Sequence, residues 1–287
     1  MAYYSRMAMN RPTTIRFYRR PGVPAALRWE RKLNAFVRSK HPSVRIVRSN
    51  ADVTVVLGGD GTVIEAVRQL SGNDTLFLGL NLGTVGFLAS ERRPLRFLRA
   101  VDVVLRARAR EELRMSLSIT VRRGNRNIFT TTSLNEVSVM NPMGMVGIDV
   151  NVDGHLLQHV HGTGVIVATP TGTTAFNLSA HGPIIDPRIE CIIVTEILDH
   201  NMPTPSIVVP PNLTVTLRVT EFRKRGTIII AGRRSPADVV LAAGGLAEYA
   251  LEQGDRIVIT RAPGVVRFAQ VNSHHFYTSL HEKFALT

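Results

Sequence analysis

Residues 52–62 read DVTVVLGGDGT, a nearly unbroken run of β-branched residues that ends in three glycines, one aspartate and a threonine. The run predicts a strand over 52–57 that is covered on both faces of a sheet. A helix is expected to start near Thr62, and in an open α/β sheet ligands collect where strands end and such helices begin. Glycines let the backbone approach a ligand, and free helical N–H groups favour phosphate. The stretch therefore predicts a phosphate-binding corner, at which Asp60 either caps the helix or takes part in chemistry.

Strand-like and helix-like segments alternate through the first hundred residues. The expected strands are 14–18, 44–47, 52–57 and 75–80, and the expected helices are 25–37, 63–70 and 94–108. Such alternation implies a parallel sheet with helices packed on it. Residues 1–111 are therefore predicted to form a three-layer α/β domain with a Rossmann-like parallel sheet.

From residue 112 onward the chain consists of short strand-like runs separated by Gly, Asn, Asp and Pro. One of them turns at Val152–Gly154 (VDG), which resembles a tight hairpin. Such a series predicts an antiparallel β-sandwich domain over residues 112–271. The tail, residues 272–287, is expected to pack back onto the first domain as a helix.

The composition is that of a globular protein, with 287 residues, 44% hydrophobic and 20% charged. No apolar run approaches the roughly 20 residues of a membrane helix. The single cysteine, Cys191, fits a reducing compartment. The net charge of +13 favours anionic partners. Arginine-rich VLRARAREELR reads as a solvated helix face, because no aromatic platform for nucleic acid is interleaved with it.

The first twenty residues contain five arginines and no acid, which is typical of an organelle transit peptide. The same stretch also reads as an opening strand. We therefore expect a cytoplasmic protein, with a mitochondrial location as the alternative.

Two further stretches are polar where the pattern predicts strands or their ends. NLGTVGFL (81–88) follows an expected strand, and its Asn81, Gly83 and Gly86 permit a second close-approach turn or serve packing alone. LNEV (134–137) places Asn135 and Glu136 in an apolar run, and neighbouring strand residues point to opposite faces. At least one of the pair must then be buried and need a partner, either in a structural network or from a hydroxyl-rich ligand such as ribose.

The most distinctive stretch is ATPTGTTAFNLSAHGPIIDP, residues 168–187. Its hydroxyls and backbone N–H groups suit phosphates, and Phe176 suits stacking on a base. A purely structural role does not readily account for so polar and glycine-rich a run.

Together these motifs resemble the NAD kinases, which phosphorylate the 2′-hydroxyl of the adenosine ribose of NAD with ATP. GGDGT, NLGTVGFL, LNEV and TPTGTTAFNLSAHGP occur in that family's order and spacing, over residues 13 to 270. GGDGT alone also suits diacylglycerol and sphingosine kinases, so a lipid kinase is one alternative. A non-catalytic NADP-binding sensor is another.

The resemblance implies a role for each matching residue. Asp60 resembles the general base, and Mg²⁺ would bridge the ATP phosphates, with no metal ligand from the protein predicted. The residues expected at NAD are Asp60, Gly61, Asn135, Glu136, Thr163, Thr174, Ala175, Phe176 and Ser179. Those expected at the ATP phosphates are Gly58, Gly59, Gly61, Thr62 and Asn81.

Several positions depart from the family pattern. Thr163 stands in HGTGV where an aspartate that helps position the nicotinamide half is usual, and Ala231 replaces another frequent aspartate. Thr84 stands where arginine is usual, and Phe176 replaces a frequent tyrosine. The expected partners are NAD and ATP, without nucleic acid or membrane. The expected assembly is a homodimer or homotetramer.

Overall fold

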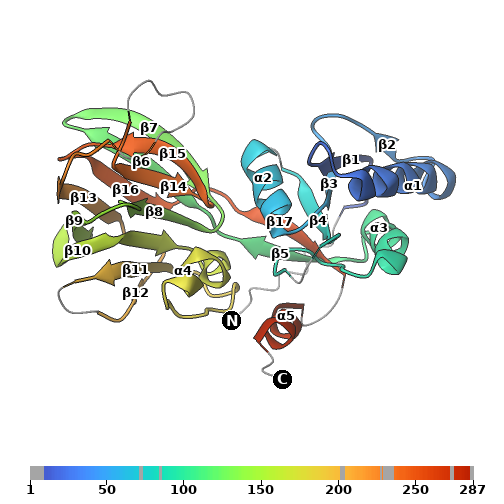
Figure 1. Ribbon diagram of the computed structural model, residues 1–287. Helices are drawn as coiled ribbons and strands as arrows, with labels where there is room; N and C mark the ends of the chain where they lie inside the picture. The colour runs from blue at the N-terminus through green and yellow to red at the C-terminus, as the bar shows by residue number, and fades with distance from the viewer. Residues whose placement is uncertain are drawn as a thin grey trace. The chain divides into compact units, whose positions relative to one another are not determined.

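The computed structural model describes residues 10–70, 74–83, 86–200, 204–226, 228, 236–271 and 275–284. The chain divides into two compact units (Figure 1). Unit 1 comprises residues 1–114 and 266–287, and unit 2 comprises residues 115–265.

Unit 1 is built on a six-stranded sheet. Its strands, in spatial order, are β2 (Arg45–Ile46), β1 (Thr14–Arg19), β3 (Val53–Leu57), β4 (Leu76–Leu80), β17 (Val266–Gln270) and β5 (Arg110–Arg114). The pairs from β2 to β17 are parallel, and only β5 runs antiparallel to its neighbour. Every residue of β3 and β4 is buried, as the continuous apolar runs predict.

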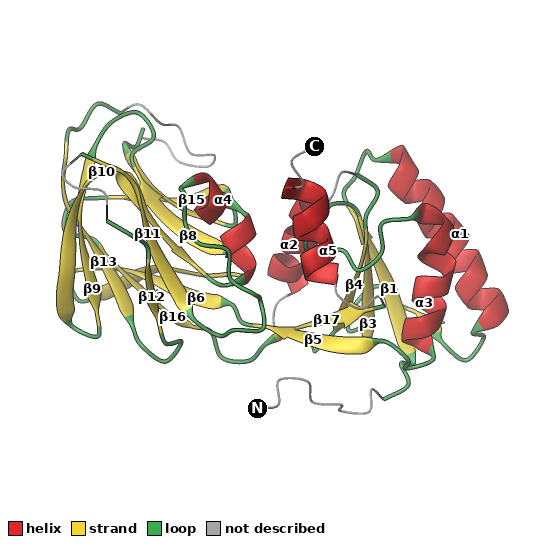
Figure 2. Ribbon diagram, turned by 90° about the horizontal axis from the view of Figure 1, so that it is seen from below, coloured by secondary structure: helices red, strands yellow, loops and turns green. Residues whose placement is uncertain are grey.

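Helices cover both faces of this sheet, which confirms the three-layer α/β prediction. They are α1 (Pro24–Lys40), α2 (Asp60–Leu70), the 3₁₀ turn η1 (Pro94–Arg96), α3 (Phe97–Leu105) and α5 (His275–Phe284). Figure 2 shows α1 and α3 on one face, and α2 and α5 on the other. Leu33 and Val37 of α1 and Phe97 of α3 are fully buried in the core of unit 1.

The structure differs from the sequence-based expectation in the sheet that one strand joins and in the ends of two helices. β17 falls in the range 112–271 expected for the β domain, but it pairs with β4 and β5 in the first sheet. The helix expected over 94–108 ends at Leu105, and Ala107 has a left-handed φ of 56°. Finally, α2 begins at Asp60, ahead of the expected start near Thr62.

Unit 2 is an antiparallel sheet system, as predicted. Its strands are β6 (Leu117–Arg123), β7 (Arg126–Ser133), β8 (Glu136–Met140), β9 (Val146–Val152), β10 (His155–Ala168), β11 (Ile192–Asp199), β12 (Ile207–Val209), β13 (Val215–Phe222), β14 (Val239–Ala243), β15 (Leu246–Leu251) and β16 (Arg256–Arg261). They run in the spatial order β15-β14-β8-β10-β9-β13-β16-β6-β7, with β11 beside β10 and β12 beside β11. Two short helical turns, η2 (Thr171–Thr174) and α4 (Phe176–Ser179), follow β10.

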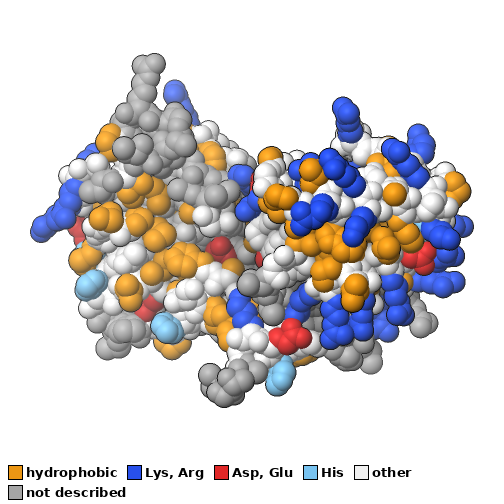
Figure 3. Space-filling view, turned by 45° about the vertical axis from the view of Figure 1, so that its right-hand side comes forward, with side chains coloured by type: hydrophobic (Ala, Val, Ile, Leu, Met, Phe, Trp, Pro, Cys, Tyr) orange, Lys and Arg blue, Asp and Glu red, His pale blue; other side chains and the backbone are white. Residues whose placement is uncertain are grey.

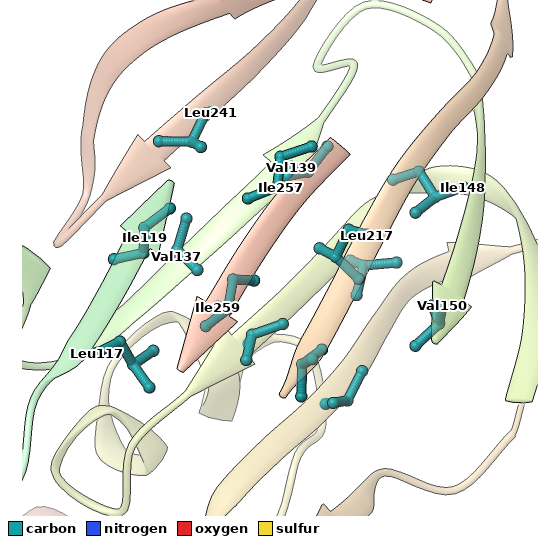
Figure 4. Close-up of a cluster of buried hydrophobic side chains, with 14 of the residues drawn as sticks. Leu117, Ile119, Val137, Val139, Ile148, Val150, Leu217, Leu241, Ile257 and Ile259 are labelled. Atoms are coloured by element: carbon teal, nitrogen blue, oxygen red, sulfur yellow. The ribbon is translucent and has the colours of Figure 1, made fainter. Parts of the chain in front are cut away.

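The sheet of unit 2 encloses a large apolar core, which gives it the character of a sandwich. Side chains from β6, β8, β9, β13, β14 and β16 meet there (Figure 4). Leu117, Val137, Leu217 and Ile259 are among those that solvent does not reach. Each contributes about 1.5–3 kcal/mol of burial free energy relative to an exposed side chain.

The net charge is confined to unit 1. That unit holds 23 Lys and Arg against 10 Asp and Glu, whereas unit 2 holds 12 of each. Figure 3 shows the basic side chains gathered over unit 1. Among the helices of the described residues, none combines the length and apolarity needed to cross a membrane.

Candidate active site

The GGDGT stretch forms the corner between β3 and α2. The N–H of Gly58 donates to the carbonyl of Leu80 at the end of β4 (3.1 Å). The N–H groups of Thr62 and Val63 donate to the carbonyl of Gly59, at 2.9 and 3.2 Å. The corner thus lies at the carboxyl ends of two parallel strands, with Asp60 in the first turn of a helix.

The carboxylate of Asp60 accepts hydrogen bonds from a segment that lies outside its own helix. The N–H of Phe87 donates to Oδ2 (2.7 Å), and the N–H of Leu88 donates to Oδ1 (3.1 Å). Gly86 allows this approach, because a Cβ there would lie 2.3 Å from Asp60 Oδ1. Asp60 is therefore a fixed acceptor rather than a simple helix cap, and each oxygen keeps capacity for another bond.

Asn81 shapes the second turn predicted at this sheet edge. It is buried, its Oδ1 accepts the N–H of Gly83 (2.8 Å), and its own N–H donates to the carbonyl of Glu91 (2.9 Å). A Cβ on Gly59 would lie 3.9 Å from Asn81 Oδ1, so the two turns are neighbours. Thr84, one of the departures from the family pattern, lies outside the described residues.

Arg20 also lies at this corner, and the sequence interpretation missed it. Its Nη2 donates to the carbonyl of Gly61 (3.1 Å), and its Nε binds Glu65 (2.6 Å). The hydrogen bond with Arg20 is the main cause that holds the pKa of Glu65 below its usual value. Arg20 directly follows β1, and the parallel pairing of β1 with β3 is what brings it to this corner. Unit 1 therefore brings together Asp60, the glycines, Asn81 and one guanidinium.

In unit 2, Asn135 directly precedes β8 and Glu136 is its first residue, and both are buried. Asn135 Oδ1 and Glu136 Oε2 have no hydrogen-bond partner among the described residues. Burial raises the pKa of Glu136 to about 7. Unpaired buried oxygens are unfavourable, and among the described residues no structural network uses these two acceptors.

The TPTGTT segment packs directly against this pair. The N–H of Thr169 donates to the carbonyl of Asn135 (2.8 Å), and its hydroxyl donates to the carbonyl of Leu134 (2.7 Å). Gly172 is required at its position, because a Cβ there would lie 2.2 Å from the carbonyl oxygen of Asn135. The structure thus joins the two motifs that the sequence singled out in this half of the chain.

The remaining residues of the segment differ in exposure. The hydroxyl of the buried Thr174 donates to the carbonyl of Thr171 (3.4 Å), and Ala175 lies half-buried between η2 and α4. Phe176 is partly buried against an apolar cluster that includes Cys191, whereas Ser179 is exposed. One side of Phe176 therefore has a packing role.

Thr163 is not part of this group. It lies on β10, five residues before Ala168, which pairs with Glu136. At about 3.3 Å per residue, Thr163 is roughly 16 Å along the strand from the buried pair. Its carbonyl accepts the N–H of Asn141 (2.9 Å). Ala231, the other missing aspartate, lies outside the described residues.

Unit 2 also contains a pocket of about 540 Å³ that none of the predicted site residues lines. It lies beyond the end of β8, opposite to the end that carries Glu136. Its lining residues are Asn141, Met143, Gly144, Met145, His161, Glu221, Phe222, Arg223, Arg225 and Asp238.

The buried carboxyl of Glu136 predicts a pH-dependent stability. Its pKa is about 7 in the folded protein, whereas the ordinary pKa of a glutamate side chain is 4.5. Because the folded state binds more protons in this window, the free energy of unfolding falls as pH rises from about 4.5 to 7. The loss amounts to about 3 kcal/mol. Denaturant unfolding of unliganded protein at pH 5 and pH 8 measures it.

The matched variant for this measurement is Glu136→Gln, which resembles the protonated acid in shape and hydrogen bonding. It is expected to lose about 3 kcal/mol less than the wild type between the two pH values. Identical pH dependence in both proteins would show that Glu136 ionises freely in the folded state.

Comparison with known proteins assigns the chain to a family. Residues 4–109 match the ATP-NAD kinase N-terminal domain, and residues 134–271 match the ATP-NAD kinase C-terminal domain. The NAD kinase of Lachnospira eligens is 32% identical over 270 residues, which cover 93% of this chain and 92% of that protein. The NAD kinase of Symbiobacterium thermophilum is 35% identical over 238 residues, which cover 82% and 79% of the two chains.

Two solved structures share the fold. A yeast NADH kinase complexed with NADH matches 97% of this chain and 89% of its own, with a TM-score of 0.85 and 19% identity. An NAD kinase from Archaeoglobus fulgidus in complex with ATP matches 96% of this chain and 100% of its own, with a TM-score of 0.75 and 19% identity. Since both family domains match in order and the relatives align over most of the chain, this protein belongs to the NAD kinase family, the transferases that phosphorylate NAD.

Proposed function

We propose that this protein transfers the terminal phosphoryl group of ATP to the 2′-hydroxyl of the adenosine ribose of NAD, with Asp60 as the general base. The observation that carries the proposal is the carboxylate of Asp60, held by two backbone amides in the first turn of α2. A helix start at the end of a parallel strand suits phosphate, and a fixed carboxylate beside it suits removal of a proton from a hydroxyl.

In the proposed reaction, Asp60 accepts the proton of the 2′-hydroxyl as the ribose oxygen attacks the γ-phosphorus of ATP. The bond from that phosphorus to the oxygen of the β-phosphate breaks, and ADP leaves with the electron pair. Phosphoryl transfer depends mainly on positioning and electrostatics. The positive end of the α2 dipole and the guanidinium of Arg20, which also pairs with Glu65, supply positive charge there. Gly58, Gly59, Gly61, Thr62 and Asn81 would border the phosphates.

The ribose and adenine of NAD are assigned to unit 2. The unpaired oxygens of Asn135 and Glu136 would accept hydrogen bonds from ribose hydroxyls. Thr174, Ala175, Phe176 and Ser179 would contact the adenosine, with the half-buried ring of Phe176 stacking on the adenine. Thr163 would contact the nicotinamide half, on the strength of the family resemblance alone.

Magnesium is proposed as a companion of ATP rather than a resident of the protein. Within the described residues, no three His, Cys, Asp or Glu side chains meet to form a metal site. Mg²⁺ is usually held largely by substrate phosphates and water, so it would need few ligands from the protein. When bound, the ion would offset charge on the transferring phosphoryl group.

A direct assay tests the proposal. Purified protein with ATP, Mg²⁺ and NAD is expected to form NADP, detected by an NADP-specific dehydrogenase, and EDTA is expected to stop it. Parallel reactions with NADH and with polyphosphate define the acceptor and donor range. Phosphorylation of diacylglycerol or sphingosine with NAD ignored would instead indicate a lipid kinase. Tight nucleotide binding by calorimetry without turnover would indicate a sensor.

Assembly and location stay predictions. A homodimer or homotetramer is expected, and light scattering of the eluted protein tests it. A cytoplasmic location, with the mitochondrion as the alternative, is tested by imaging the full-length chain with a C-terminal tag.

A further inference from the structure

The amides that bind Asp60 belong to a segment that the C-terminal helix holds in place. The ring of Phe87 contacts Phe276 of α5, with centroids 6.0 Å apart. The ammonium of Lys283 lies 4.9 Å from the centroid of the same ring. Phe87 is nearly fully buried, so the contacts with α5 restrict the residue whose N–H binds the carboxylate.

A second set of contacts with α5 lies at Arg92, just beyond Phe87 and Leu88. Arg92 forms an ion pair with Glu282 and donates a hydrogen bond to the hydroxyl of Ser279. Ser279 is buried, although α5 lies at the end of the chain. Helix α5 therefore contacts both Phe87, which supplies one of the two amides, and Arg92, four residues beyond Leu88.

The contacts come from one face of α5. Phe276, Ser279 and Lys283 follow the helical spacing of three and four residues that places side chains on one side. The other side is exposed, as at Tyr277 (52%) and Phe284 (41%). An isolated helix of ten residues is marginal in water, so these tertiary contacts are what hold α5 on unit 1.

We propose that α5 is a positioning element for the catalytic carboxylate: through Phe87 and Arg92 it fixes the two amides that orient Asp60. The proposal rests on the role of Asp60 proposed above. Phe276 and Lys283 are positioning residues in this scheme, because they act on the reaction through the segment that binds Asp60.

The test compares Phe276→Ala and Lys283→Ala with His281→Ala, a matched control at an exposed position on the same helix. Phe276→Ala is expected to lower kcat about ten- to a hundredfold, because a small misplacement of a reacting group is costly. Lys283→Ala is expected to lower kcat a few-fold, the scale of an exposed cation–π contact. KM for NAD and for ATP is expected to change less than twofold. Lys283→Arg, which keeps the contact, is expected to restore the rate.

A double-mutant cycle separates positioning from general structural damage. In an Asp60→Ala background no carboxylate remains to be oriented, so Phe276→Ala is expected to cause no further loss of kcat. An equal loss in both backgrounds would overturn the proposal. If Phe276→Ala folds poorly, the same cycle with Lys283→Ala replaces it. Lys283 is exposed, so its replacement is expected to leave the fold intact. Full activity of Asp60→Ala would refute the catalytic role of Asp60 itself, which is a separate outcome.

Discussion

Replacing Asp60 with asparagine is expected to lower kcat for NAD phosphorylation about a thousandfold, in the middle of the range for a lost general base. The amide keeps an oxygen that can accept an N–H from Phe87 or Leu88, so the corner is expected to fold as before. It cannot take the proton of the ribose hydroxyl. Steady-state kinetics measures the loss, and calorimetry is expected to show that NAD still binds.

The matched control for Asp60→Asn is Asp74→Asn, which removes a carboxylate of the same unit at an exposed surface position. Asp74 pairs with Arg267, away from the GGDGT corner, and its replacement is expected to leave kcat unchanged. Retention of more than a tenth of the wild-type kcat by Asp60→Asn would exclude proton removal by this residue.

The second large effect is expected from Gly86→Ala, which adds one methyl group and leaves every charged residue in place. The new Cβ would lie 2.3 Å from Oδ1 and 2.6 Å from Cγ of Asp60, closer than atoms can approach. The carboxylate must then rotate away from its two amides. We expect kcat to fall about a hundredfold, because correct orientation of the reacting group is lost.

Gly83→Ala provides the comparison within the same loop. A Cβ there meets nothing nearer than Asn81 Oδ1, at 3.6 Å, which is an ordinary contact. This variant is expected to keep most of its activity. If Gly86→Ala behaves like Gly83→Ala while both proteins unfold at the wild-type denaturant concentration, the orientation of Asp60 is not important for the rate.

Much of the fold follows from local patterns. The β-branched run of residues 53–57 favours a strand buried on both faces, and the structure contains that strand. The hairpin turn at Val152–Gly154 was also predictable, because Asp-Gly is a typical turn sequence. In the structure Asp153 and Gly154 both adopt the positive φ that such a turn needs. By contrast, the run at 266–270 predicts a strand but not its partners. Which sheet it joins depends on β4 and β5, which lie far away in sequence.

The sequence predicted which residue types form the candidate site, but it did not predict how those residues contact one another. The sequence indicated that Asn135 or Glu136 must be buried, and the structure buries both. It did not indicate which donors hold Asp60, because those amides lie 27 and 28 residues further along the chain. Backbone donors carry no side-chain signature. Arg20 was overlooked because its partners become neighbours only when β1 and β3 pair.

The confinement of the positive charge to unit 1 has a kinetic consequence for nucleotide capture. ATP and NAD are anions, and the positive charge of unit 1 is expected to accelerate their diffusion toward the unit that carries GGDGT. The field extends about 8 Å at physiological ionic strength and is shortened by added salt. Added salt is therefore expected to slow the association of nucleotide with the protein and to leave the hydrogen bonds that orient Asp60 intact. Unit 2, with its balanced charge, contributes little to this long-range attraction.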